Sequence, residues 1–253
     1  MNAATAEALS ALNRHFYAVH AEEFSATRQA PWPGWERVLA VLHPQADGGA
    51  LRVLDVGCGN GRFARFLAAR LEGAPLVVEG VDASAPLLEH ARRGAPPGCR
   101  FHRADAAADP AALPAGPFEA VVLWGVLHGV PGRARREALL RACATRVAPG
   151  GLLAFTLWRL EADARRRSRF LDWNAYSSRA PMPIDCSQLE PGDRLLPWGP
   201  GDEVLRYCHA FDEREIEDAL AALGALGLAP EARFRADGRG GEQNEYLLLR
   251  RAG

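Results

Sequence analysis

The chain has 253 residues, 48% of them hydrophobic, which is enough to bury a full core in one α/β domain and argues against two equal domains. Its formal net charge of −1 gives no overall electrostatic reason to expect a nucleic acid or an anionic membrane as partner, and leaves only local basic patches open. Every basic residue of the Lys or Arg type is arginine, which excludes a Schiff-base lysine and the phosphate-binding lysine of P-loop proteins.

The cysteines give no sign of a zinc site or a disulfide framework. They are odd in number, far apart and without a C-x-x-C pair, at Cys58, Cys99, Cys143, Cys186 and Cys208. The N-terminal stretch is amphipathic, unlike a secretory signal, and no run approaches the ~18 apolar residues of a membrane span. We therefore expect a cytoplasmic protein with no metal site and no membrane contact.

The segment before Leu51 predicts a helix from Thr5 to Arg28, followed by a stretch rich in proline and tryptophan at residues 31–35. We expect residues 1–45 to form a helical cap. Its aromatic end either packs across an edge of the sheet or forms one wall of a cofactor pocket.

From Leu51 onward, short β-rich runs alternate with helical stretches, which is typical of a parallel sheet covered by helices on both faces. The predicted strands are 51–56, 76–81, 100–102, 118–124 and 152–157, and the helices between them are 62–71, 86–94 and 132–147. Residues 158–206 are rich in proline and break this rhythm, so we expect an inserted lid or substrate-recognition segment. A helix from Asp212 to Leu223 and an antiparallel hairpin of 232–235 with 244–250 close a single α/β domain spanning residues 1–253.

A glycine-rich motif joins the first predicted strand to the next helix, and it reads Asp55-Val56-Gly57-Cys58-Gly59-Asn60-Gly61. Open α/β sheets bind ligands at this place, where glycine lets the backbone turn sharply and a ligand approach closely. The spacing G-x-G-x-G differs from the dinucleotide motif G-x-G-x-x-G, and Asp55 would lie where a pyrophosphate must go. A ligand with an ammonium group fits better, and the methionyl end of S-adenosylmethionine carries one.

Two more carboxylates follow the next two strands. Asp82 can accept hydrogen bonds from both ribose hydroxyls, or it is simply an acid at the start of the helix near Pro86. Asp105, with the Ala106 amide, can bind the adenine ring, or it is a plain loop residue. Together with Asp55 they match the three polar parts of S-adenosylmethionine, which is the predicted cofactor.

Positions 51–157 resemble the class I methyltransferase superfamily, which implies a Rossmann-like fold with a mostly parallel seven-stranded sheet. A closer resemblance, to the tRNA wobble-uridine carboxymethyl methyltransferases, extends beyond that core and is carried by Phe24-Ser25-x-Thr27-Arg28-x-x-Pro31-Trp32-Pro33, Asp55 to Gly61, Val126-Leu127-His128, Pro197-Trp198 and Arg206-Tyr207-Cys208-His209-Ala210-Phe211. The sequence departs from that family at Gly129, where a second histidine is common, at Cys208, where an aromatic is usual, and at Asn244-Glu245-Tyr246, where Asp-Asn-Trp is usual.

This resemblance implies methylation of a carboxymethyl group on the wobble uridine of tRNA, with a small zinc-ribbon activator subunit as a possible partner. A carboxylate acceptor is ionised at neutral pH, so it needs orientation rather than a base. An amine or phenol acceptor would instead need a neutral histidine or a carboxylate nearby.

Each residue assigned to chemistry also has a structural interpretation. His128 orients or deprotonates the acceptor, or caps the next helix; Arg28 pairs with the methionyl carboxylate, or lies at the surface. The predicted cofactor contacts are Arg28, Asp55, Gly57, Cys58, Gly59, Asp82, Ala83, Asp105, Ala106 and Trp124. The predicted catalytic residues are His128, Arg206 and His209, and the predicted substrate contacts, which are otherwise core or loop residues, are Trp32, Trp198 and Tyr207.

Three functions stay open on the sequence alone. The first is a methyltransferase acting on tRNA. The second is a methyltransferase for a small carboxylate, phenol or amine, which the near-neutral charge favours. The third is a cofactor-binding partner subunit without catalysis, against which the complete set Asp55, Gly57, Gly59 and Asp82 argues.

Overall fold

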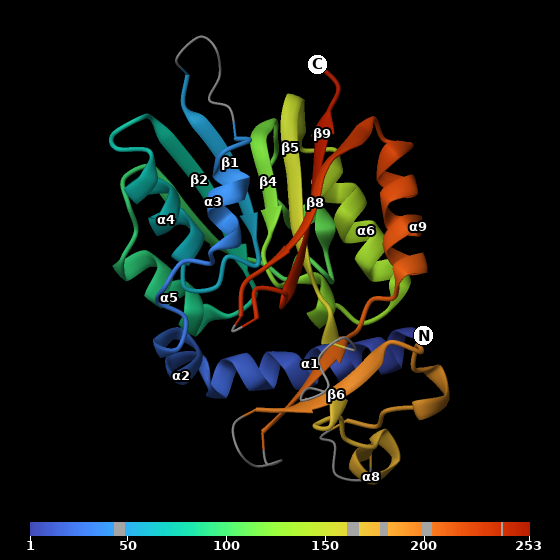
Figure 1. The fold of residues 1–253 in the computed structure, drawn as a ribbon. Helices are drawn as coiled ribbons and strands as arrows, with labels where there is room; N and C mark the ends of the chain where they lie inside the picture. The colour runs from blue at the N-terminus through green and yellow to red at the C-terminus, as the bar shows by residue number, and fades with distance from the viewer. Residues whose placement is uncertain (43–48, 161–166, 178–181, 199–203, 239) are drawn as a thin grey trace.

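The computed structural model describes residues 1–42, 49–160, 167–177, 182–198, 204–238 and 240–253. Within them lies a seven-stranded sheet in the order β3-β2-β1-β4-β5-β9-β8, parallel except for the closing pair β9 and β8 (Figure 1). Its strands are β1 (Leu51–Val56), β2 (Leu76–Asp82), β3 (Cys99–Arg103), β4 (Phe118–Leu123), β5 (Val147–Trp158), β8 (Leu228–Ala236) and β9 (Asn244–Arg251). The predicted α/β fold, with its closing antiparallel hairpin, is confirmed.

Helices cover both faces of this sheet (Figure 1). One face carries α3 (Gly34–Leu39), α4 (Arg62–Arg70) and α5 (Ala85–Arg93), and the other carries α6 (Arg133–Ala144) and α9 (Glu213–Gly224), with the short turns η1 (Pro110–Ala112) and η2 (Leu127–Gly129) in the connections. Side chains of β1 and β4 are buried in two separate core clusters, one on each face. Burial on both faces explains why these strands lack polar alternation in the sequence.

The expected single N-terminal helix is wrong in one respect, because the chain turns at His20. It forms α1 (Ala3–Val19) and then α2 (Ala21–Ala26), which contacts α5 through an ion pair of Glu22 with His90. Helix α1 crosses the end of the sheet at which β1, β2 and β4 finish (Figure 1). Asn13 fixes it there, since its side chain bonds the carbonyl of Gly129 and both backbone groups of Tyr207.

Part of the stretch 158–206, continued to His209, forms a second, two-stranded sheet that was not predicted from the sequence. Strand β6 (Asp193–Pro197) pairs antiparallel with β7 (Leu205–His209), next to α8 (Trp173–Ser177) and η4 (Cys186–Gln188). This sheet lies on the side of α1 away from the main sheet (Figure 1). Residues 161–166, 178–181 and 199–203 lie outside the described part, so the lid function of 158–206 stays a prediction. Every helix in the described part is too short or too polar to cross a lipid bilayer.

A buried carboxylate ties the N-terminal segment to the closing hairpin. The Gly34 amide donates to Asp237 Oδ1 (2.9 Å), while Asp237 Oδ2 accepts from Asn244 Nδ2 (2.7 Å) and from the Tyr246 hydroxyl (2.6 Å). A Cβ on Gly34 would lie 2.4 Å from Cζ of the fully buried Tyr246 ring. The clamp therefore needs glycine, and it fixes the start of the helix that carries Trp35.

We expect Gly34→Ala to lower the free energy of unfolding by about 1–3 kcal/mol, because the Tyr246 ring has no space into which to move. Urea unfolding followed by circular dichroism measures this. Gly224→Ala is the control, since a Cβ there meets nothing within 4 Å. Equal stability of the two variants would show that the clamp tolerates a methyl group.

Candidate active site

The glycine loop after β1 is built from hydrogen bonds to the end of β2. The amides of Gly57 and Cys58 donate to the Val81 carbonyl (2.7 and 3.0 Å), and the Gly59 amide donates to Asp82 Oδ2 (2.9 Å). Gly57 has φ of +71°, and a Cβ on it would lie 2.4 Å from Val126 Cγ2. Gly59 has φ of +55° and open space where its Cβ would be. The first glycine is required for packing, and the second leaves a ligand room to approach.

Asp55 is the most unusual charged group of this loop. Asp55 is 1% exposed, and neither of its carboxylate oxygens has a hydrogen-bond partner among the described residues. Burial, followed by the nearby Asp82, raises its pKa to about 7, although Arg62 acts in the opposite direction. A buried carboxylate without a partner is costly, so the site fits a ligand that brings a positive charge. The methionyl ammonium of S-adenosylmethionine has the required chemistry.

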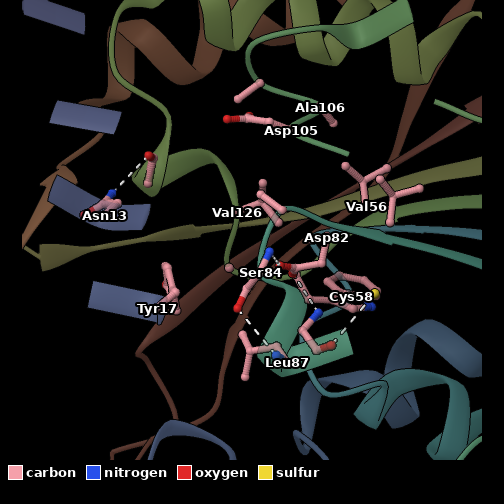
Figure 2. A pocket seen from close by; sticks show the side chains of 18 of the residues that line it. Asn13, Tyr17, Val56, Cys58, Asp82, Ser84, Leu87, Asp105, Ala106 and Val126 are labelled. Carbon is pink, nitrogen blue, oxygen red and sulfur yellow. Dashed lines mark hydrogen bonds between the residues drawn. The ribbon is translucent and has the colours of Figure 1, made fainter. Parts of the chain in front are cut away.

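A pocket of about 390 Å³ opens between this loop and α1 (Figure 2). All ten predicted cofactor contacts line it, together with His128, Arg206 and Trp32. Trp124 lines it and is 8% exposed, with an indole N–H that has no partner among the described residues. The pocket thus brings most of the predicted residues together at the carboxyl ends of β1, β2 and β4.

Asp82 and Asp105 hold different positions in this pocket. Asp82 accepts backbone hydrogen bonds from Gly59 and Ser84, so both of its oxygens are fixed before any ligand binds. Asp105 is more exposed, accepts from the Ala108 amide (3.1 Å) and lies 3.6 Å from Arg14 of α1. Asp82 is therefore the more rigidly held hydrogen-bond acceptor, and Asp105 is the more exposed of the two.

Two arginines gather at the other side of the pocket. Arg28 stacks on Phe24 (3.8 Å from guanidinium carbon to ring centre) and lies 4.9 Å from the ring centre of Trp198, which in turn lies 5.1 Å from Arg206. Burial, followed by the charge of Arg206, lowers the pKa of Arg28 to about 10. Neither guanidinium has a carboxylate partner in the described ranges, so this end of the pocket attracts an anion. Trp198 is a neighbour of both arginines but does not line the pocket itself.

His128 lies in η2, directly after β4, and is 3% exposed. Its ring stacks on Trp158 with centres 3.7 Å apart, and Arg206 lies 4.9 Å from the same Trp158 ring. Side chains from η2, from the end of β5 and from β7 therefore meet at one wall of the pocket.

Tyr207 and His209 lie outside the pocket. Successive side chains of a strand point to opposite faces, so Arg206 faces the pocket while Tyr207 and His209 face the other way. The Tyr207 hydroxyl donates to Asp193 Oδ1 (2.7 Å), and His209 bonds Asp193 through Nδ1 (2.8 Å) and Glu215 through Nε2 (2.9 Å). The predicted cluster of three is divided, and the roles of Tyr207 and His209 as substrate and catalytic contacts have no support from these positions.

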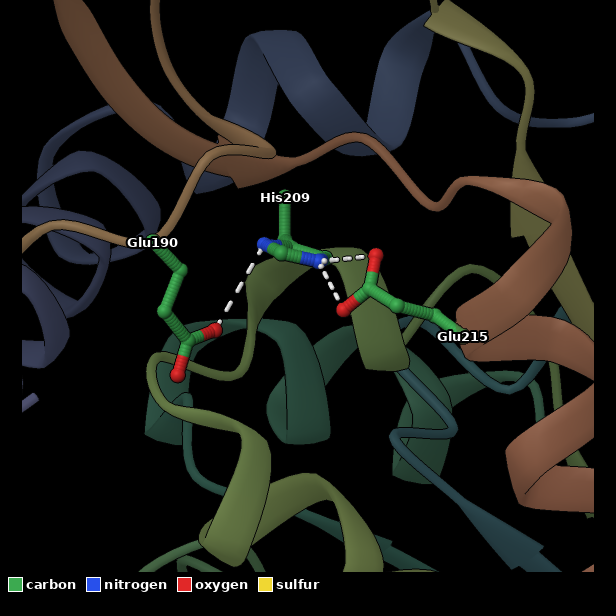
Figure 3. Close-up of side chains that lie close together, drawn as sticks. All are labelled: Glu190, His209 and Glu215. Carbon is green, nitrogen blue, oxygen red and sulfur yellow. Dashed lines mark hydrogen bonds and ion pairs between the residues drawn. The ribbon is translucent and has the colours of Figure 1, made fainter.

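The His209 contacts are part of a buried ionic network (Figure 3). Glu190 and Glu215 lie near opposite ring nitrogens of His209, and Arg136, itself 3% exposed, donates to both glutamates (2.7 and 3.3 Å). These atoms are close enough together to hold a metal ion, but each is already engaged in a hydrogen bond or ion pair. The network links β7 to α6 and α9, and we assign it a structural role.

This network predicts a pH-dependent stability. Burial alone would lower the pKa of His209, but its bonds to Asp193 and Glu215 raise it above the ordinary 6.5. Burial alone would raise the pKa of Glu215, but its bond to His209 lowers it below the ordinary 4.5. The His209 contribution is present below pH 6.5 and is lost as pH rises through the raised value, and the Glu215 contribution is present above pH 4.5 and is lost as pH falls.

The Tm difference between the unsubstituted protein and His209→Gln is therefore expected to be at least twice as large near pH ~5.5 as near pH ~8.5. Thermal unfolding across this range measures it. His15→Gln, an exposed histidine of α1, is the control and should show no such trend. A constant difference across the range would mean that the fold leaves the pKa of His209 unshifted.

Several residues that line the pocket are not among the contacts predicted from the sequence. Tyr17 and Trp35 line the pocket, but sequence spacing does not distinguish a pocket aromatic from a core aromatic. Asn60 lies within the glycine motif and bonds Ser25 Oγ (3.1 Å) and the Arg28 carbonyl (3.2 Å), so it fixes the segment that carries Arg28. Its place in the motif was the one available signal.

Comparison with known proteins finds methyltransferases similar to this chain. Residues 53–151 match the family described as a methyltransferase domain. A protein of Encephalitozoon cuniculi named as a methyltransferase is 31% identical over 234 residues, covering 92% of both chains. A tRNA (carboxymethyluridine(34)-5-O)-methyltransferase of Xenopus tropicalis is 28% identical over 238 residues, which are 78% of this chain, and the match spans only 35% of that relative's length.

A solved structure gives the same fold. Magnesium protoporphyrin IX methyltransferase of Synechocystis, with bound S-adenosylhomocysteine, has a TM-score of 0.64 at 16% identity, covering 96% of this chain and 99% of that one. Fold, pocket and relatives agree: this chain belongs to the class I methyltransferases, enzymes that use S-adenosylmethionine, and it resembles their tRNA wobble-uridine branch.

Proposed function

We propose that this enzyme methylates a carboxylate oxygen, and that the carboxylate belongs to a carboxymethyl group on the wobble uridine of tRNA. The observation that carries the proposal is the pair Arg28 and Arg206, two guanidinium groups at one side of the cofactor pocket with no carboxylate partner in the described ranges. The name of the Xenopus tropicalis relative supports the same acceptor class.

The residues of this chain divide into a cofactor side and an acceptor side. On the first, Asp55 would hold the ammonium, Asp82 the ribose, and Asp105 with Ala106 the adenine. On the second, Arg206 would bind the acceptor carboxylate, while Arg28 beside it would pair with the methionyl carboxylate of the cofactor. Both cations stay protonated at neutral pH, so they recognise an ionised acid without moving a proton.

The chemistry needs only alignment. Bound S-adenosylmethionine supplies the methyl group: a carboxylate oxygen forms the new O–C bond as the S–C bond breaks, the sulfur keeps the electron pair, and no proton is released. The carboxylate is already ionised, so His128 serves to orient the acceptor wall through its stack on Trp158 rather than as a base. Orienting the acceptor at about 3 Å from the methyl group is then the main contribution of the protein.

The test is transfer of labelled methyl from S-adenosylmethionine to tRNA that carries 5-carboxymethyluridine, compared with tRNA that lacks the carboxymethyl group. We expect label only in the first, with an alkali-labile bond, because methyl esters hydrolyse readily. Rates should fall steeply with salt, since phosphate contacts release counterions. The assay is run with the protein alone and with the zinc-ribbon subunit of a relative added, since the resemblance implies such an activator.

A small-molecule extract provides the competing acceptor in the same assay. Label that enters only small molecules contradicts the tRNA assignment. If those products are methyl esters, the carboxylate assignment stands; methylated phenols or amines contradict it as well.

A further inference from the structure

Tyr17 is a polar side chain of the pocket to which the proposed chemistry gives no task. It belongs to one face of α1, since the pocket is lined by Ser10, Asn13, Arg14, Tyr17 and Ala18, at helical spacing. Figure 2 shows it on the wall that α1 contributes, with Asp82 and Ser84 on the wall at the end of β2. It therefore lies across the pocket from the proposed ribose acceptor.

The Tyr17 ring is held firmly. It packs edge-on against Phe16, with ring centres 4.9 Å apart, and against Phe24, at 5.1 Å. Phe24 is also the ring on which Arg28 stacks, and Arg206 lies 5.7 Å from the ring centre of Phe16. The phenol is thus placed among the same aromatic side chains that position the two arginines.

Its hydroxyl has no hydrogen-bond partner among the described residues. Burial raises the pKa of Tyr17 above its ordinary value of 10, which Arg206 and Arg28 offset only in part, so the group is a protonated donor at neutral pH. The neighbouring guanidinium groups carry donors alone and offer no acceptor. An acceptor for this O–H other than solvent must therefore come from a ligand, and beside two cations that ligand atom is an anionic oxygen.

We propose that the Tyr17 hydroxyl binds the acceptor substrate, donating a hydrogen bond to the carboxylate oxygen that is not methylated. The inference rests on the proposed carboxylate acceptor. A carboxylate has two oxygens and about four lone-pair directions. With one oxygen held by Tyr17 and Arg206, the other stays directed at the methyl group, and its nucleophilicity is not reduced by a donor.

The kinetic signature follows from the charge of the acceptor, which falls from −1 to zero during transfer. A donor to that carboxylate stabilises the bound substrate at least as well as the transition state, so its loss raises KM more than it lowers kcat. We expect Tyr17→Phe to raise KM for tRNA bearing 5-carboxymethyluridine by ~10-fold or more, as for a hydrogen bond to a charged group. The Kd for S-adenosylmethionine, measured by calorimetry, should change by less than twofold.

Tyr176→Phe is the matched control, since it removes the same hydroxyl from α8, outside the pocket, and should leave KM and Kd unchanged. A Kd for S-adenosylmethionine that rises in step with KM would place the hydroxyl on the cofactor and overturn the proposal. An unchanged KM in Tyr17→Phe would also overturn it, while leaving the proposed function intact. An unsubstituted protein that esterifies no carboxylate would overturn the proposed function and this assignment together.

Discussion

Replacing Asp55 by Asn is expected to raise the Kd for S-adenosylmethionine by at least ~30-fold at pH 7.5, which corresponds to about 2 kcal/mol for removal of one partner from a buried charge pair. Asn has nearly the same shape, but it cannot neutralise the methionyl ammonium. The carboxylate has no other partner in the described ranges, so nothing replaces it. Isothermal titration calorimetry measures the change directly.

The pH dependence makes this result specific to the ionised group. The pKa of Asp55 is about 7, so affinity in the unsubstituted protein should fall by ~10-fold for each pH unit below that value, whereas Asp55→Asn should show a flat profile. Asp109→Asn, which removes a loop carboxylate outside the pocket, is the control. A flat profile in the unsubstituted protein would contradict the ammonium assignment.

The second large effect is expected at Arg206. Arg206→Gln should lower kcat/KM for a carboxylate acceptor by ~100-fold, about 3 kcal/mol, because it removes the cation that binds the acid. Arg206→Lys should recover part of this loss, since it keeps the charge but not the planar fork of donors. The Kd for S-adenosylmethionine should stay within twofold, and steady-state kinetics with calorimetry provide both readings.

Arg37→Gln is the matched control, since Arg37 also stacks on an aromatic ring, 3.6 Å from Phe234, but lies outside the pocket. Arg28→Gln and the double substitution Arg28→Gln/Arg206→Gln complete a double-mutant cycle. Because the two guanidinium groups lie 4.9 and 5.1 Å from the centre of the same Trp198 ring, we expect their effects to be coupled rather than additive. An Arg206→Gln enzyme with unchanged kcat/KM would show that the acceptor is neutral.

Strand positions and the cofactor side were accessible from the sequence, since local signals determine them. β1 occupies residues 51–56 as predicted, because burial on both faces gives it a mostly apolar run, in Leu51, Val53, Leu54 and Val56, that Gly57 ends. Asp55, Gly57 and Asp82 depend on the same turn, so their positions in the pocket follow from the strand boundaries alone.

The acceptor side was only partly accessible, because it depends on contacts between distant segments. The turn at His20 coincides with packing of α2 on α5, which no local pattern records. The sequence predicts one cluster of Arg206 and Tyr207, but their side chains point to opposite faces because residues 205–209 form a strand. Recognition of that strand would have required its partner β6, which lies in a proline-rich stretch that resembles a loop.

The buried carboxylate of Asp55 also affects how much enzyme a cell can maintain. Its pKa is higher in the fold than the ordinary 3.8, so its contribution to stability is present below that value and is lost as pH rises through about 7. At neutral pH the ligand-free protein is therefore weakened, and cofactor at 100 times its Kd adds ~2.7 kcal/mol. Since unfolded chains are degraded continuously, we expect the amount of this enzyme in cells to follow methionine supply, and pulse-chase labelling during methionine limitation would reveal it as a shortened half-life.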